Sequence, residues 1–119
     1  MTVSDPVLDV ICIGRSSVDL YGGQVGGRLE DMSSFSKYIG GSPTNISIGC
    51  ARLGLKSALI TRVGDEHMGR FIRETLADES VDTSHVITDD ELQDVKWKND
   101  ENFGVHIGVH QPRKMHEIG

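Results

Sequence analysis

Two short segments carry side chains suited to binding a hydroxylated molecule. Gly40 and Gly41 directly precede a helical pattern, and Asn45 falls on its first turn. Glycines let a ligand approach the backbone, free amides at a helix N-terminus bind oxygen atoms, and an Asn side chain is both donor and acceptor. Asp19 follows an apolar strand pattern, and its carboxylate can accept hydrogen bonds from two neighbouring hydroxyls. This combination is suited to polyol binding, although the spacing alone favours the simpler alternative. The alternative is a capped helix beside a solvated Asp.

A glycine-rich stretch tests the nucleotide-binding alternative. Gly22 and Gly27 have the spacing of a phosphate-binding P-loop, but Arg28 and Leu29 stand where that motif requires Lys and Ser or Thr. The dinucleotide motif G-x-G-x-x-G is also missing after the first strand pattern. These glycines are therefore interpreted as turn residues.

Three histidines near the C-terminal end raise the question of a metal site. His106 and His110 would share one face of a helix, but Gly108 and the alternation of apolar residues around it favour a strand. Four residues of strand span about 13 Å, too far for two ligands of one ion. Together with His116, these side chains are predicted to be solvated, and no metal site is predicted.

The elements that must position the candidate residues alternate between strand and helix. Residues 7–14 form a buried strand pattern, residues 57–63 a second and residues 85–88 a weaker third. Helical patterns occupy the intervals before the second and third strands, which predicts a parallel α/β sheet with right-handed crossovers. In residues 15–39, two short alternating segments predict a small β-flap inserted after the first strand.

Both helices have recognisable ends. Ser42 is predicted to be the N-cap of the first helix, with Pro43 in its first turn and Gly54 as its left-handed stop. Asp65 is predicted to cap the second helix. The apolar faces expected to be buried consist of Ile46, Cys50 and Leu53 on the first helix, and of Met68, Phe71, Ile72 and Leu76 on the second.

The composition disfavours several classes of function. The chain has 119 residues, the length of one domain, and a formal net charge of −6, which argues against a nucleic-acid or anionic-membrane surface. No apolar stretch approaches the about 20 residues that are needed to span a bilayer. Cys12 and Cys50 are predicted to be buried free thiols, and the N-terminal residues lack the pattern of a signal peptide, so a cytoplasmic location is expected.

The stretch from Gly40 to Ser47, followed by Gly54 and Gly64, resembles the N-terminal signature of the ribokinase-like, phosphofructokinase-B type carbohydrate kinases. The resemblance is strongest to the 5-dehydro-2-deoxygluconokinases of inositol breakdown. It implies a Rossmann-like fold whose β-flap closes over the sugar and often pairs two subunits, so a homodimer through the flap is expected. The resemblance covers about residues 7–88 and includes the segments 14–21, 26–32 and 62–69.

The resemblance also implies roles for individual residues. Asp19 would hold sugar hydroxyls, Gly41 would contact the sugar through its backbone, and Asn45 would hydrogen-bond it. Beyond what the resemblance implies, we infer that Arg15 would pair with the carboxylate of a sugar acid, a bidentate fit that a guanidinium provides. The intact enzymes of this family use ATP and Mg²⁺.

One motif of the family is missing from the chain. Family members carry Asp-Thr-x-Gly-Ala-Gly-Asp near the C-terminal end, and its last Asp is the catalytic base. Asp82 and Thr83 begin like this motif, but no Gly-Ala-Gly-Asp follows. The chain is therefore expected to bind ATP poorly and to be inactive on its own. The alternatives are a non-catalytic polyol-binding or flap-dimerising module and a non-functional remnant of a truncated, frameshifted or misassembled gene.

The character of the sequence changes after residue 88. Residues 89–102 are polar and have no clear period, so the alternation of strands and helices is not continued. Residues 1–88 are therefore predicted to be the N-terminal part of a carbohydrate-kinase domain. Residues 89–119 are predicted to be a divergent tail, either disordered or out of register with the family.

Overall fold

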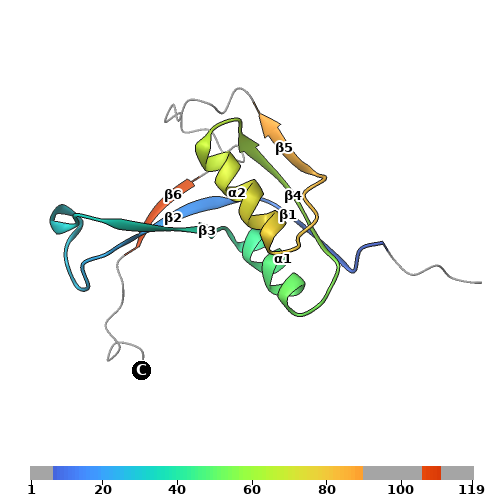
Figure 1. Ribbon diagram of the computed structural model, residues 1–119, viewed down its shortest axis with the longest axis horizontal. Coiled ribbons are helices and arrows are strands. Elements are labelled where there is room, and N and C mark those ends of the chain that lie inside the picture. The colour runs from blue at the N-terminus through green and yellow to red at the C-terminus, as the bar shows by residue number, and fades with distance from the viewer. Residues whose placement is uncertain (1–6, 90–105, 111–119) are drawn as a thin grey trace, which may run out of the picture.

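A computed structural model of the chain describes residues 7–89 and the backbone of residues 106–110 (Figure 1). Its central sheet has three parallel strands in the order β1-β4-β5. Cys12 lies beside Leu59 in the register of the first pair, and Thr61 lies beside Val86 in that of the second. The strands are β1 (Val10–Ile13), β4 (Ser57–Gly64) and β5 (Val86–Asp89).

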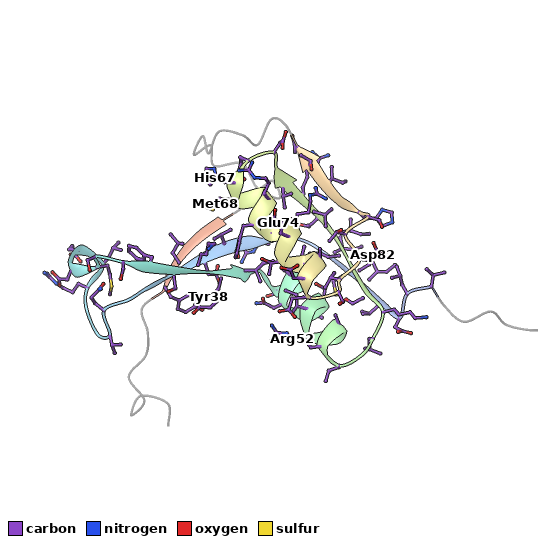
Figure 2. The ribbon with its side chains drawn as sticks, viewed as in Figure 1. Tyr38, Arg52, His67, Met68, Glu74 and Asp82 are labelled. Atoms are coloured by element: carbon purple, nitrogen blue, oxygen red, sulfur yellow. The ribbon has the colours of Figure 1, made fainter. Side chains whose placement is uncertain are left out.

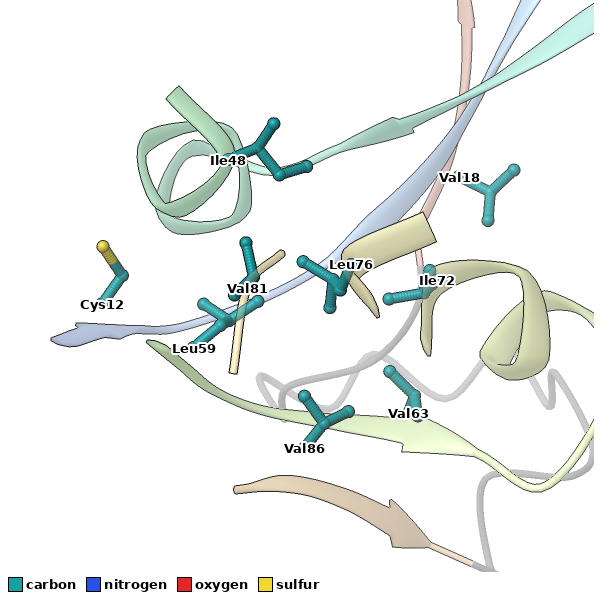
Figure 3. Packing of buried hydrophobic residues seen from close by; sticks show 9 residues of the cluster. All are labelled: Cys12, Val18, Ile48, Leu59, Val63, Ile72, Leu76, Val81 and Val86. Atoms are coloured by element: carbon teal, nitrogen blue, oxygen red, sulfur yellow. The ribbon is translucent and has the colours of Figure 1, made fainter. Parts of the chain in front are cut away.

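Two helices connect these strands, α1 (Ser42–Arg52) before β4 and α2 (His67–Asp78) before β5. Each connection joins parallel neighbours, and both move in the same direction across the sheet. Because both crossovers are right-handed and run in the same direction, both helices lie on the same face of the sheet (Figure 3). The expected α/β class with a parallel sheet is confirmed.

The core lies between the two helices and the covered face of the sheet (Figure 3). Ile72 and Leu76 of α2 are fully buried there against Leu59 of β4, and Met68 and Phe71 pack at the margin. The predicted buried face of α2 is therefore confirmed. Burial of each such Leu or Ile stabilises the fold by about 1.5–3 kcal/mol. The buried cluster consists of Cys12, Val18, Ile48, Leu59, Val63, Ile72, Leu76, Val81 and Val86.

The predicted buried face of α1 is wrong. Ile46 is 57% exposed and Leu53 is 84% exposed, while Cys50 is half-buried. The helix instead buries Thr44, Ser47 and Ile48. Two of these side chains end in hydroxyls that find hydrogen-bond partners inside the fold, so an expectation based on apolar residues alone selected the wrong side of the helix.

The N-caps of both helices differ from the predicted ones by one residue. Gly41 is the N-cap of α1, and Ser42 is the first helical residue. Glu66, rather than Asp65, caps α2, because its carboxylate accepts hydrogen bonds from the amides of Met68 and Gly69, both at 2.8 Å. Asp65 is exposed. The predicted stop of α1 is confirmed, since Gly54 has a φ of +90°.

The predicted β-flap is present as a second sheet with the order β3-β2-β6. Strands β2 (Ser17–Gly22) and β3 (Phe35–Gly40) are antiparallel, and the loop between them contains a 3₁₀ turn at Leu29–Asp31. Figure 1 shows this ribbon as an arm that extends away from the helices and the parallel sheet. Strand β6 (His106–His110) pairs with β2 in parallel orientation, although its residues were expected to belong to a divergent tail.

The prediction for the histidine side chains lies outside the described residues. In the part of the chain that is described with side chains, no group of three or more His, Cys, Asp or Glu residues is placed to hold a metal ion. Neither α1 nor α2 is long and apolar enough to cross a membrane, which holds for the described segments.

Both cysteines are free thiols, as predicted. Cys12 is buried and Cys50 only half-buried. Burial, and secondarily the neighbouring Cys50, raises the pKa of the Cys12 thiol. A raised pKa keeps this sulfur protonated and therefore unreactive.

Candidate functional site

The carboxylate of Asp19 lies against Gly40 at the root of the flap. In the β2–β3 ladder Ser17 is opposite Gly40 and Asp19 is opposite Tyr38. The Ser17 hydroxyl donates to Asp19 Oδ1 at 3.0 Å. A Cβ atom at position 40 would collide with the Asp19 carboxylate and would lie 2.6 Å from Ser17 Oγ. The absence of a side chain at Gly40 therefore leaves room for the carboxylate of Asp19.

Gly41 lets the chain turn from the flap directly into α1. Its φ is +98°, a conformation that favours glycine, and a Cβ atom there would lie 2.5 Å from the carbonyl oxygen of Arg15. The return of the flap is thus packed on the loop that follows β1. Asn45 joins the same turn, since its backbone amide donates to the Gly41 carbonyl at 2.8 Å.

Buried hydroxyls hold this arrangement together. Thr44 Oγ1 donates to the carbonyl of Arg15 at 3.1 Å. Ser16 Oγ lies 2.8 Å from Thr44 Oγ1 and 3.4 Å from Thr61 Oγ1. Ser16, Thr44 and Thr61 are all buried, so the group links the loop after β1, the first turn of α1 and strand β4. We call these three residues the hydroxyl cluster.

The hydroxyl cluster was not predicted as part of the site. Its signal in the sequence is weak, because Ser and Thr are common at helix starts and in loops. A usable signal is their position directly beside the candidate ligands, Ser16 after Arg15 and Thr44 before Asn45. Burial of polar side chains at such positions requires mutual hydrogen bonds, which only the fold brings about.

The five predicted site residues lie close together. Four of them meet through their backbones, namely Arg15, Gly40, Gly41 and Asn45. Asp19 reaches this group through its side chain. Arg15 and Asn45 are both exposed, so their side chains are accessible from solvent. Asn45 lines a hollow of about 350 Å³ whose other walls include Tyr38, Gly49 and Arg52. Arg15 and Asp19 do not line this hollow.

Two tyrosines that were not predicted as site residues lie beside Asp19. The rings of Tyr21 and Tyr38 pack edge to face, with centroids 5.2 Å apart and an interplanar angle of 88°. They line a second hollow of about 550 Å³ next to the turn at Gly22 and Gly23. Residues 19 and 21 share one face of β2 by strand alternation, and this period is the signal that sequence reasoning overlooked.

An ion pair closes the far rim of the hollow at Asn45. Arg52, labelled in Figure 2 together with Tyr38, contacts Glu79 through two hydrogen bonds, at 2.8 and 2.5 Å. The hydrogen bond with Glu79 raises the pKa of Arg52, and the same contact lowers the pKa of Glu79. Both groups are therefore charged at neutral pH, and the pair ties the end of α1 to the end of α2.

Comparison with known proteins identifies relatives of the chain. The sequence model of the pfkB family carbohydrate kinases matches residues 7–102. The 5-dehydro-2-deoxygluconokinase of Geobacillus thermodenitrificans is 51% identical over 82 residues, which is 69% of this chain and 24% of that protein. The protein of the same name from Bacillus subtilis is 41% identical over 85 residues, 71% of this chain and 26% of its own length. The chain thus spans about a quarter of the curated relatives it matches.

Solved structures give the same result for the fold. An uncharacterised sugar kinase from Pyrococcus horikoshii superposes with a TM-score of 0.72 and 31% identity, over 88% of this chain and 31% of the other. That kinase has also been solved in complex with ATP. A PfkB protein from Polaromonas superposes with a TM-score of 0.74 and 32% identity, over 90% of this chain and 32% of its own.

Proposed function

Since the chain belongs to the pfkB family of carbohydrate kinases, we propose that its described part binds the sugar substrate of a kinase acting on 5-dehydro-2-deoxygluconate. The observation that carries the proposal is the packing of the Asp19 carboxylate in the space left by Gly40, directly beside the Gly41 turn. The names of the relatives support the choice of sugar.

Each predicted site residue has a role in this proposal. Asp19 accepts hydrogen bonds from two substrate hydroxyls, while Ser17 holds one of its oxygens in place. The Gly41 turn lets the substrate approach the backbone, and Asn45 adds a donor and an acceptor from the first turn of α1. Arg15, exposed beside this turn, pairs with the carboxylate of the sugar acid.

Phosphoryl transfer needs groups that the described residues do not supply. The intact kinases use ATP with Mg²⁺, but no cluster of acidic side chains suited to a metal ion occurs in the part described with side chains, and the sequence lacks the Gly-Ala-Gly-Asp motif. These residues therefore do not fit the nucleotide site. In our proposal the chain contributes substrate binding, and a base and an anion hole must come from elsewhere.

A second role of the flap is pairing with the flap of another copy. Val25 and Leu29 near the flap tip are 67% and 53% exposed. Apolar side chains grouped in this way at the end of a projecting arm favour contact with a partner. This observation also supports the alternative of a non-catalytic, flap-dimerising module.

Substrate binding is tested by titrating the 119-residue chain with 5-dehydro-2-deoxygluconate and following saturation transfer to the ligand by NMR. Asp19→Asn keeps an acceptor for Ser17 but loses the charge. We expect it to weaken binding by about tenfold to a hundredfold, the worth of a charge-assisted hydrogen bond. Glu30→Gln, which removes an exposed carboxylate from the flap turn, is the control and should bind like the unaltered chain. Equal binding by both variants would contradict the role of Asp19.

Activity is tested by following ADP formation with ATP, Mg²⁺ and the same sugar acid. The chain alone is expected to show no turnover above the background, because loss of a general base costs about 10²–10⁴-fold and loss of the anion hole adds to this. An intact relative serves as the positive control. A rate within tenfold of that relative would refute the assignment of substrate binding without transfer.

A further inference from the structure

One face of the flap presents a continuous row of candidate ligands and tyrosines. The β2–β3 register places Ser17 opposite Gly40, Asp19 opposite Tyr38, and Tyr21 opposite Ser36. Directly opposed residues share a face of an antiparallel ribbon, so Asp19, Tyr38 and Tyr21 lie on the same side. The other face carries Val18, which is fully buried against the core. The tyrosine face is therefore the face that does not pack on α2.

Tyr38 is the member of this row that connects the two predicted ligands. It is the direct cross-strand neighbour of Asp19, and it lines the same hollow as Asn45. Tyr38 is 56% exposed, although the diagonal contact with Tyr21 fixes the orientation of its ring. An exposed but oriented aromatic ring contributes little to the core, and it remains available for contact with a ligand.

The chemistry of a sugar acid matches such a surface. Its hydroxyls require hydrogen-bonding groups, whereas its carbon atoms present C–H bonds that have no polar partner. The π face of an aromatic ring carries partial negative charge, which attracts the positive end of C–H bonds, and ring contact also removes apolar area from water. A carboxylate beside an aromatic ring can therefore contact the hydroxyls and the C–H groups of the substrate at the same time.

We propose that Tyr38, held in place by Tyr21, is a substrate-binding residue whose ring packs against the C–H groups of the hydroxylated acid that Asp19 and Asn45 bind. This inference rests on the proposed function and assigns a further residue to the same site. Tyr38 selects for a carbon skeleton lying over the flap, whereas Asp19 selects for the hydroxyls. Tyr21 acts as a positioning residue through Tyr38.

The test uses the 119-residue chain and 5-dehydro-2-deoxygluconate as the probe. Tyr38→Ala should raise the Kd by about tenfold, and Tyr38→Phe, which keeps the ring, should stay within about twofold of the unaltered chain. Phe35→Ala is the matched control, because Phe35 is a half-exposed aromatic residue of the same strand on the opposite face, and its loss should leave the Kd unchanged. Amide NMR spectra of each variant check that the flap is still folded.

A measurement on the unaltered chain does not depend on any variant folding. Selective saturation of the tyrosine ring protons should transfer to the C–H protons of the probe. If transfer is missing, or if Tyr38→Ala binds like the unaltered chain while Asp19→Asn has lost affinity, the role of Tyr38 is refuted and the proposed function stands. If the unaltered chain does not bind the probe at all, both are refuted.

Discussion

At the scale of single residues, the site depends on the absence of a side chain at position 40. The Asp19 carboxylate occupies the volume that a Cβ atom would need there. Gly40→Ala is therefore expected to destabilise the fold by about 1–3 kcal/mol, as overpacking does, unless the carboxylate moves. Denaturant unfolding measures the change. Combining Gly40→Ala with Asp19→Ala should recover part of the loss, because one of the two colliding side chains is then gone while Ser17 Oγ remains.

The control for this substitution is Gly49→Ala on α1. Apart from the neighbouring residues and the backbone of the helix itself, no atom lies within 4 Å of the position that a Cβ would take there. The replacement should therefore stabilise the chain by about 0.5–1 kcal/mol through helix propensity alone. If both alanines changed stability in the same direction, a steric conflict at position 40 would not be the cause.

At the residue level, the sequence selected positions that lie close together in the fold, and their roles as sugar ligands stay predictions. The glycine pair and Asp19 meet at the flap root. The hydroxyl cluster was missed, because three buried Ser and Thr residues look like ordinary turn residues until the fold brings them together. The role of Tyr38 was missed for a related reason, since its neighbour Asp19 lies on another strand.

At the scale of elements, the turn between α2 and β5 contains a group that links stability to pH. Both the amide and the hydroxyl of Ser84 donate to the Asp82 carboxylate, labelled in Figure 2, and these bonds lower the pKa of Asp82. A carboxyl whose pKa is lowered by folding stabilises the fold above its unfolded pKa of about 4 and loses that contribution as the pH falls through the lowered value.

The effect expected from removing the Asp82 carboxylate follows from the direction of this pKa shift. Asp82→Ala should melt below the unaltered chain at pH 7, and the difference should shrink as the pH is lowered from about 4. Melting temperatures measured by circular dichroism between pH 7 and pH 2 test this. Glu74→Gln, at an exposed carboxylate of α2, controls for the loss of one negative charge. A melting difference that stays constant over this range would show that the Ser84 bonds do not act through the charge of Asp82.

The kinds of elements were predictable, but some of their faces and caps were not. Strands and helices follow the apolar periods, which depend on local sequence. The buried face of α1 depends on hydrogen bonds of Ser16 and Thr44 across the fold, so Ile46 was wrongly expected inside. The cap of α2 was misassigned because Asp65 and Glu66 are adjacent carboxylates, and only the backbone geometry selects the second.

At the scale of the whole molecule, one face of the parallel sheet lacks a covering layer among the described residues. Both helices lie on the other face (Figure 3). Ile11, Ile13 and Ile87 are 54%, 69% and 47% exposed. Parallel sheets are normally covered on both faces, so this surface should pair with that of a second copy when the chain is alone in solution.

Sedimentation velocity over a range of concentrations tests this expectation. The unaltered chain should show concentration-dependent association, and Ile13→Thr should shift it to higher concentration, because it removes apolar area from this face. Leu53→Thr is the control, since Leu53 is even more exposed but lies at the end of α1, which packs on the other face of the sheet. Equal effects of the two substitutions would mean that general hydrophobicity, and not this face, drives association.

The clamping of both flap strands at one end has a mechanical consequence. The hydroxyl cluster and the Gly41 turn fix the root, while six-residue strands carry the opposite end about 20 Å away. A rigid lever of that length converts a rotation of about 10° at its pivot into a displacement of about 3.5 Å at its tip. A fluorescent label at Val25, an exposed residue of the flap loop, would therefore register small adjustments around Asp19.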